Sequence, residues 1–153
     1  MLLVVADTGP IHYLVEIGHV GILPQLFQRI FIPSLVYDEL RHPFAPASVR
    51  AWVDTSPKWL HILPVTPSDD PALERLDDGE KSALTLGMTL GADLILIDDR
   101  KGAAVALQKG FQITGTLGSA HTVRTAWSTG PRRCLNGLSA RILTAARSCS
   151  TTF

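Results

Sequence analysis

The chain has 153 residues, of which 46% are hydrophobic and 18% charged, and its 14 Lys and Arg balance its 14 Asp and Glu. This composition is typical of one soluble globular domain and excludes a disordered chain. No apolar run approaches the roughly 20 residues of a membrane helix, and two cysteines, Cys134 and Cys149, are too few for a disulfide framework or a zinc site.

Short apolar runs alternate with helical patterns along the chain. Continuous runs of branched apolar residues predict strands buried on both faces, and apolar residues three or four apart predict helices. In chain order we predict strand 2–6, helices 11–17 and 20–28, strand 29–32, helices 35–41 and 47–53, strand 59–63, helix 80–90, strand 94–97, helix 101–109 and strand 111–114. This alternation indicates an α/β fold with a parallel sheet and right-handed crossovers. The start of the chain reads as a strand without the basic segment of a signal peptide, so we expect a cytoplasmic protein.

Several residues predict where these elements begin and end. We expect a turn at residues 8–10 (Thr-Gly-Pro), an N-cap at Ser34, and a polar loop at residues 66–71. Asp77 and Asp78 are candidate N-caps of the long helix, and Gly91 is its expected C-cap.

Carboxylates follow two of the predicted strands directly. Asp7 ends strand 2–6, and Asp98 and Asp99 end strand 94–97. Working residues of open α/β sheets gather at the carboxyl ends of the strands, so these acids meet at one edge if the two strands are neighbours. Carboxylates held close together repel one another, which indicates a bound cation or raised pKa values.

Residues 119–153 differ in composition from the rest of the chain. All 14 acidic residues lie in 1–99 with six Lys and Arg, a net charge of −8, whereas residues 100–153 hold eight Lys and Arg and no acid, a net charge of +8. An acidic site beside a basic half suits a metal centre that faces an anionic polymer. A basic arm, a disordered tail and a terminus altered by a frameshift all remain open interpretations of this segment.

Five stretches together resemble the motif series of PIN domains. They are residues 5–8 (Val-Ala-Asp-Thr), 32–40 (Ile-Pro-Ser-Leu-Val-Tyr-Asp-Glu-Leu), 76–80 (Leu-Asp-Asp-Gly-Glu), 94–100 (Leu-Ile-Leu-Ile-Asp-Asp-Arg) and 114–118 (Thr-Gly-Thr-Leu-Gly). More narrowly, the series resembles a branch of VapC-like toxin relatives. The resemblance implies a PIN-like domain over residues 1–118, built as a three-layer α/β/α sandwich around a parallel sheet of four to five strands. It also implies metal-dependent cleavage of RNA, often by the toxin of a toxin–antitoxin pair.

The resemblance carries over to individual acidic positions. It implies that the catalytic and metal-binding acids are Asp7, Glu39, Glu80 and one of Asp98 and Asp99. Thr8 matches the small hydroxyl residue that accompanies the first acid and would orient Asp7 or contact the scissile phosphate. Carboxylate oxygens suit Mg²⁺ or Mn²⁺, which can activate a water and stabilise the charge of phosphodiester hydrolysis.

The resemblance also implies partners. Arg100 and Lys101 follow the acids and could contact phosphates of the RNA substrate. Relatives of this type pair as homodimers, for which residues 11–17 and 20–28 offer apolar surfaces, and an antitoxin protein covers their acidic site.

Each acid also has a purely structural interpretation. Asp7 could form a turn, Asp77 or Asp78 could cap a helix, Glu80 could be a first-turn acid, and one of Asp98 and Asp99 could cap the next helix. A catalytically degenerate PIN-like module that binds RNA or protein is therefore the main alternative. A phosphoacceptor domain is disfavoured, because a receiver needs its acidic pair after the first strand and a haloacid-dehalogenase-like phosphatase needs an Asp where this chain has Gly9.

Overall fold

A computed structural model of the chain describes residues 2–55 and 57–116, so the expectations for residues 119–153 lie outside the described part. The elements are β1 (Val4–Ala6), α1 (Thr8–Glu16), α2 (Ile22–Phe27), β2 (Ile30–Pro33), α3 (Ser34–Leu40), α4 (Ala47–Asp54), β3 (Leu60–Leu63), the 3₁₀ helix η1 (Pro71–Leu73), α5 (Asp78–Leu90), β4 (Leu94–Leu96), α6 (Arg100–Gln108) and β5 (Gln112–Thr114). None of the helices in the described residues is long and apolar enough to span a membrane.

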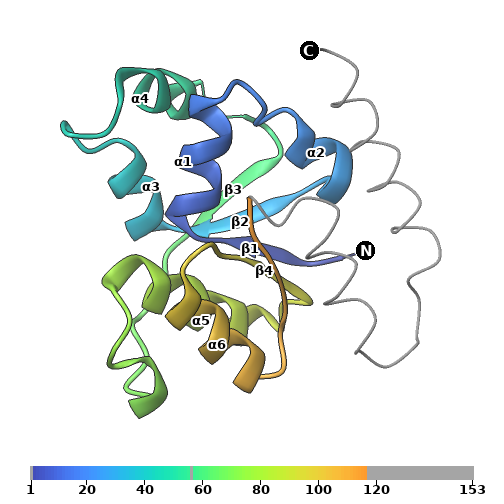
Figure 1. Ribbon diagram of the computed structural model, residues 1–153, viewed down its shortest axis with the longest axis vertical. Coiled ribbons are helices and arrows are strands. Elements are labelled where there is room, and N and C mark those ends of the chain that lie inside the picture. The colour runs from blue at the N-terminus through green and yellow to red at the C-terminus, as the bar shows by residue number, and fades with distance from the viewer. Residues whose placement is uncertain (1, 56, 117–153) are drawn as a thin grey trace.

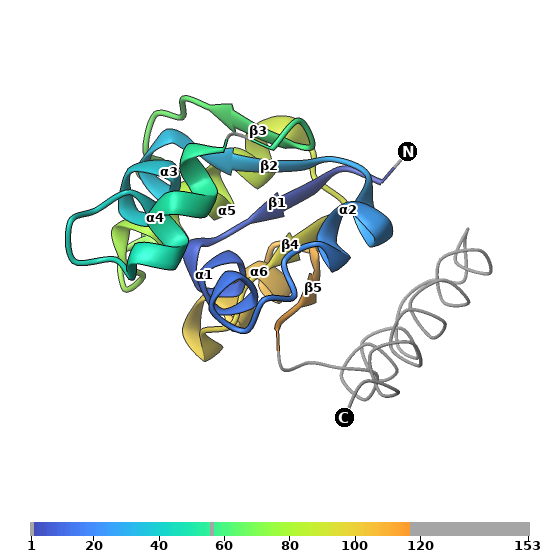
Figure 2. The ribbon, with the colours of Figure 1, turned by 90° about the horizontal axis from the view of Figure 1, so that it is seen from above.

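The five strands form one parallel sheet in the order β3-β2-β1-β4-β5, which Figure 2 shows from above. β1 lies at the centre, with Val5 opposite Phe31 of β2 and Ile95 of β4. A strand between two neighbours and two helical layers has no exposed face, which explains its uninterrupted apolar run. The predicted parallel sheet is confirmed.

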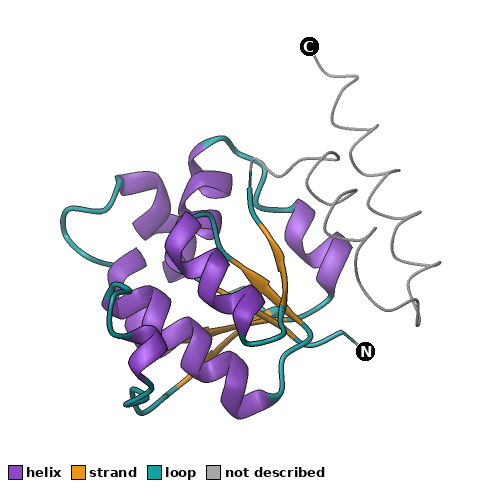
Figure 3. Cartoon of the chain, turned by 60° about the horizontal axis from the view of Figure 1, so that its bottom comes forward, coloured by secondary structure: helices purple, strands orange, loops and turns teal. Residues whose placement is uncertain are grey.

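The alternation of side chains along the strands separates two hydrophobic cores. Val4 and Ala6 of β1 pack in the core that α1, α2, α3 and α4 cover. Val5 faces the opposite way and packs with residues of η1, α5 and α6. Figure 1 shows α5 and α6 on one side of the sheet, and Figure 3 shows the strands enclosed by helices. The α/β/α sandwich is therefore confirmed.

The residues predicted as a turn before α1 and as the N-cap of α3 have other roles in the structure. The expected turn at residues 8–10 is instead the first turn of α1, which begins at Thr8 directly after Asp7. Proline is tolerated in a first helical turn because its missing N–H has no intrahelical partner there. Ser34 is not the N-cap of α3, since Pro33, the extended last residue of β2, takes that position. Strand and helix are thus joined without a loop at both places.

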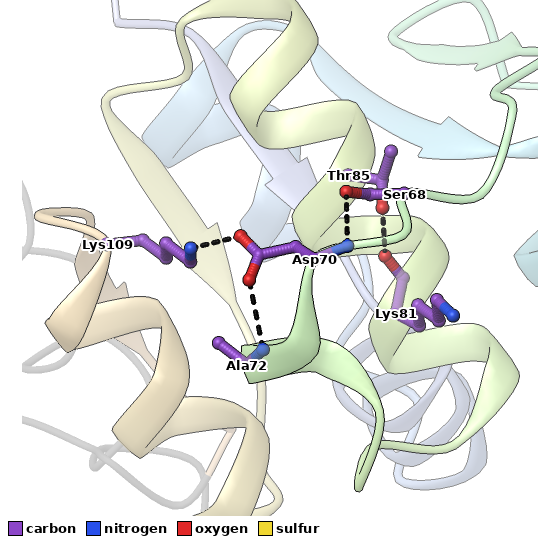
Figure 4. A network of polar contacts seen from close by, with 6 residues as sticks. All are labelled: Ser68, Asp70, Ala72, Lys81, Thr85 and Lys109. Atoms are coloured by element: carbon purple, nitrogen blue, oxygen red, sulfur yellow. Dashed lines mark hydrogen bonds and ion pairs between the residues drawn. The ribbon is translucent and has the colours of Figure 1, made fainter.

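The polar segment before α5 is tied to α6 by Asp70. The Asp70 carboxylate accepts from the backbone N–H of Ala72 at 2.9 Å, which caps η1, and from the Lys109 ammonium group after α6 (Figure 4). The hydrogen bond from Lys109, followed by that from Ala72, lowers the pKa of Asp70. The expected loop at residues 66–71 therefore leads into a short helix, and this contact holds the segment ahead of α5 in place.

Candidate active site

Asp7 lies at the carboxyl end of the central strand, next to the end of β4. Its backbone N–H donates to the carbonyl of Leu96 at 2.9 Å, which continues the pairing of β1 with β4. Asp98 and Asp99 follow β4 at this same edge of the sheet. The prediction that the ends of these two strands lie side by side is confirmed.

The Asp7 side chain is buried, with 8% of its surface exposed. Burial raises the pKa of Asp7 to about 6, and the nearby carboxylates of Asp77 and Glu39 add to the shift. The backbone N–H groups of Thr8 and Gly9 offset part of it. The chain therefore holds at this edge a carboxylate whose negative charge is disfavoured until a cation or a proton compensates it.

Glu39 reaches the site from α3, which packs against α5 and α1. The Thr8 hydroxyl, in the first turn of α1, donates a hydrogen bond to Glu39 Oε2. This bond joins two segments that are 31 residues apart in the sequence. The hydroxyl that the resemblance assigned to Asp7 or to a phosphate is thus bonded to the second acid.

Glu80 and Asp77 form a capping box at the start of α5. Asp77 Oδ1 accepts from the Glu80 backbone N–H at 2.8 Å, and Glu80 Oε2 accepts from the Asp77 backbone N–H at 3.3 Å. Burial, followed by the charge of Asp77, raises the pKa of Glu80 to about 7, with smaller contributions from Asp99 and Asp7. Asp77 is therefore both the predicted N-cap and a neighbour of the acids, and Gly91 ends the helix in the left-handed conformation, as expected.

We expect Asp77→Ala to lower the free energy of unfolding by about 1 kcal/mol, because the Glu80 N–H loses its acceptor. Asp77→Asn should retain most of the stability, since asparagine caps helices as well as aspartate. Urea unfolding of the two variants measures the difference. Equal losses in both would mean that the charge of Asp77, and not its cap, stabilises α5.

The adjacent acids after β4 make different contacts. Asp99 is the N-cap of α6, and its Oδ1 accepts from the N–H groups of Lys101 at 2.7 Å and Gly102 at 3.2 Å. The N–H groups of Gly102 and Lys101 lower the pKa of Asp99, and the Glu80 carboxyl contributes less. Asp98 instead accepts from the backbone N–H of Thr116 at 2.6 Å and from the Thr116 hydroxyl. Asp99 is thus associated with Glu80, whereas Asp98 is bonded to Thr116, the second residue after β5.

Arg100 and Lys101 lie in the first turn of α6, directly after these acids, and both are exposed to solvent. Cationic side chains at the rim of an acidic site are available to contact the phosphates of an anionic substrate. Their predicted role in RNA binding stays a prediction.

The donor chemistry of the site fits a hard divalent cation. Asp7, Glu39, Glu80 and Asp99 offer only carboxylate oxygens, the ligands that Mg²⁺ and Mn²⁺ prefer. Within residues 2–55 and 57–116, no three acidic, histidine or cysteine side chains form a ready-made metal-binding group. The charges of Asp77 and Glu39 raise the pKa of Asp7, and those of Asp77, Asp99 and Asp7 raise the pKa of Glu80, so these acids nevertheless lie close enough to interact electrostatically.

The fold and the site together define an α/β protein with an acidic site at the carboxyl edge of a parallel sheet. The sequence profile of the PIN domain matches residues 3–120, so the chain belongs to the PIN domain family. PIN domains are generally nucleases, which are hydrolases. No curated protein matches the chain. The resemblance to PIN domains is confirmed, while the narrower resemblance to VapC-like toxins stays a prediction.

Proposed function

We propose that this protein is a metal-dependent endoribonuclease that hydrolyses RNA phosphodiester bonds. The main support is the position of Asp7, a buried carboxylate at the end of the central strand with Glu39 and Glu80 close enough to interact with it electrostatically. These acids come from separate segments of the chain. Because like charges repel, bringing them together destabilises the fold, which favours a functional reason for their placement.

Each acid would have a role that follows from its position in the site. Asp7 would be the central ligand of Mg²⁺ or Mn²⁺, completed by Asp99 or Asp98, with Glu39 and Glu80 as further ligands. A bound ion would activate a water molecule and stabilise charge on the phosphate and the leaving oxygen. Thr8 holds the Glu39 carboxylate by its hydrogen bond, and Asp99 is oriented by the first turn of α6. Arg100 and Lys101 would bind the flanking phosphates.

The toxin role, the partners and the location belong to the same proposal. A homodimer would bury part of the apolar surface around α1, where Tyr13 is 38% and Ile17 45% exposed. An antitoxin would inhibit the protein by covering the acidic edge. The protein would bind both partners and the RNA substrate in the cytoplasm.

The test is cleavage of a mixed single-stranded RNA pool and of a circular RNA by the full chain. We expect cutting with Mg²⁺ or Mn²⁺ and none with EDTA, because the acids need a cation to act on a phosphate. Cutting of the circle distinguishes an endonuclease from an exonuclease, which needs a free end. A folded, metal-replete chain that binds RNA and cuts neither substrate would contradict the proposal and favour the degenerate binding module.

A further inference from the structure

Gly79 lies where the Glu39 carboxylate approaches α5 most closely. A Cβ atom on Gly79 would stand 2.8 Å from Glu39 Oε2, 3.0 Å from Oε1 and 3.2 Å from Cδ. Real Cβ atoms essentially never lie within 3.0 Å of a heavy atom of another residue, so the carboxylate occupies the space that any other residue would fill.

The backbone of α5 does not require a glycine at this position. Gly79 is the second residue of the helix and lacks the positive φ that Gly18, Gly91 and Gly110 have. A glycine within a helix is less favourable than alanine because it loses more conformational entropy on folding. The packing of Glu39, and not the conformation of the backbone, therefore explains why position 79 is a glycine.

We propose that Gly79 is a positioning residue for Glu39. The carboxylate of Glu39 is held on one side by the Thr8 hydroxyl and on the other by the bare Cα of Gly79. The first turn of α5 also supplies the positive end of a helix dipole, which favours a carboxylate at this place. A methyl group on residue 79 would push the carboxylate away from the Thr8 hydroxyl and from its position near Asp7.

The consequence for metal binding rests on the proposed function. The Glu39 carboxylate is the flexible end of a long side chain, so it can move aside at little cost to the fold. We therefore expect Gly79→Ala to fold, to keep or raise the urea midpoint in EDTA, and to lose about 10- to 100-fold in Mn²⁺ affinity, the usual effect of disturbing the residues that orient a metal ligand.

Gly87 on the same helix is the matched control. A Cβ atom there would stand 2.7 Å from Ile95 Cδ1 and 3.4 Å from Phe111 Cζ, in the core between α5 and the sheet. Gly87→Ala should lower the urea midpoint and leave the Mn²⁺ affinity of the folded chain unchanged. Gly79→Ala is thus expected to lower the Mn²⁺ affinity without lowering the urea midpoint, whereas Gly87→Ala is expected to do the reverse.

The experiment is Mn²⁺ calorimetry and urea unfolding of the full chain, with both glycine variants alone and combined with Glu39→Ala. If Gly79 acts through Glu39, Gly79→Ala should have no further effect on Mn²⁺ affinity once Glu39 is replaced by alanine. If Gly79→Ala alone does not fold, the double variant still decides: it should fold, and its failure to fold would overturn the inference.

The outcomes separate this inference from the proposed function. Wild type that binds Mn²⁺, with Gly79→Ala binding equally well, would overturn only the positioning role of Gly79. Equal losses of affinity with and without the Glu39→Ala substitution would also overturn it, because the effect would then not pass through the carboxylate. Wild type without Mn²⁺ binding would overturn the proposed function and, with it, the positioning role.

Discussion

Asp7→Asn is expected to reduce metal-dependent RNA cleavage by roughly 100- to 1000-fold, the usual cost of losing one group that stabilises charge in a transition state. The carboxylate would be the central metal ligand, and asparagine offers a neutral oxygen in its place. The same variant should unfold at a higher urea concentration than wild type when both are measured in EDTA at about pH 8. Burial disfavours the charge of Asp7, and the substitution removes that charge.

The measurement pairs cleavage of the RNA pool with urea unfolding and Mn²⁺ calorimetry. Asp38→Asn is the matched control, because Asp38 is exposed on α3 beside Glu39, and it should change none of the three results. Loss of cleavage with a gain of stability would separate a functional acid from a structural one. Cleavage and Mn²⁺ binding at wild-type levels in Asp7→Asn would show that the metal is bound elsewhere.

Stability without metal is expected to fall as the pH rises from about 5 to about 8. The folded chain raises the pKa of Asp7 from 3.8 to about 6 and that of Glu80 from 4.5 to about 7. Between the unfolded and folded pKa values the folded state binds more protons, so each group's contribution is fully present below its unfolded pKa and is lost as the pH passes its folded pKa. For Asp7 alone, a shift of this size corresponds to about 3 kcal/mol.

Groups with lowered pKa values set the acid limit of this trend. Asp70 and Asp99 have pKa values below 3.8 in the folded chain, so their contributions are present above 3.8 and are lost as the pH falls through their folded values. Stability in EDTA should therefore be greatest at about pH 4 to 5, between the two sets of groups.

Thermal unfolding in EDTA across this pH range tests the trend. Asp7→Asn and Glu80→Gln should each flatten the decline above about pH 5, because each removes one group that takes up a proton on folding. Excess Mn²⁺ should oppose the decline, since a cation that binds only the folded chain stabilises it. A wild-type stability that rises steadily toward pH 8 in EDTA would contradict the burial of these charges.

Local patterns were enough to predict most of the fold and the edge at which the acids gather. The apolar runs that became β1 and β4, and the cap residues Asp77 and Gly91, act within a few residues of themselves, so their effects are readable along the chain. The parallel arrangement followed from the alternation of strands and helices, and it brought the ends of β1 and β4 together. The predicted turn at residues 8–10 is nevertheless wrong, because these turn residues are also compatible with the start of a helix.

The directions of the site's side chains depended on packing between distant segments. Thr8 and Glu39 are 31 residues apart, and nothing in either neighbourhood predicts their hydrogen bond. Asp98 and Asp99 are adjacent in sequence, yet one bonds to Thr116 and the other caps α6 beside Glu80. The space beside Gly79 exists only because α3 packs against α5. Backbone signals are local, whereas burial, close approach and the resulting pKa shifts arise only when segments far apart in the chain meet.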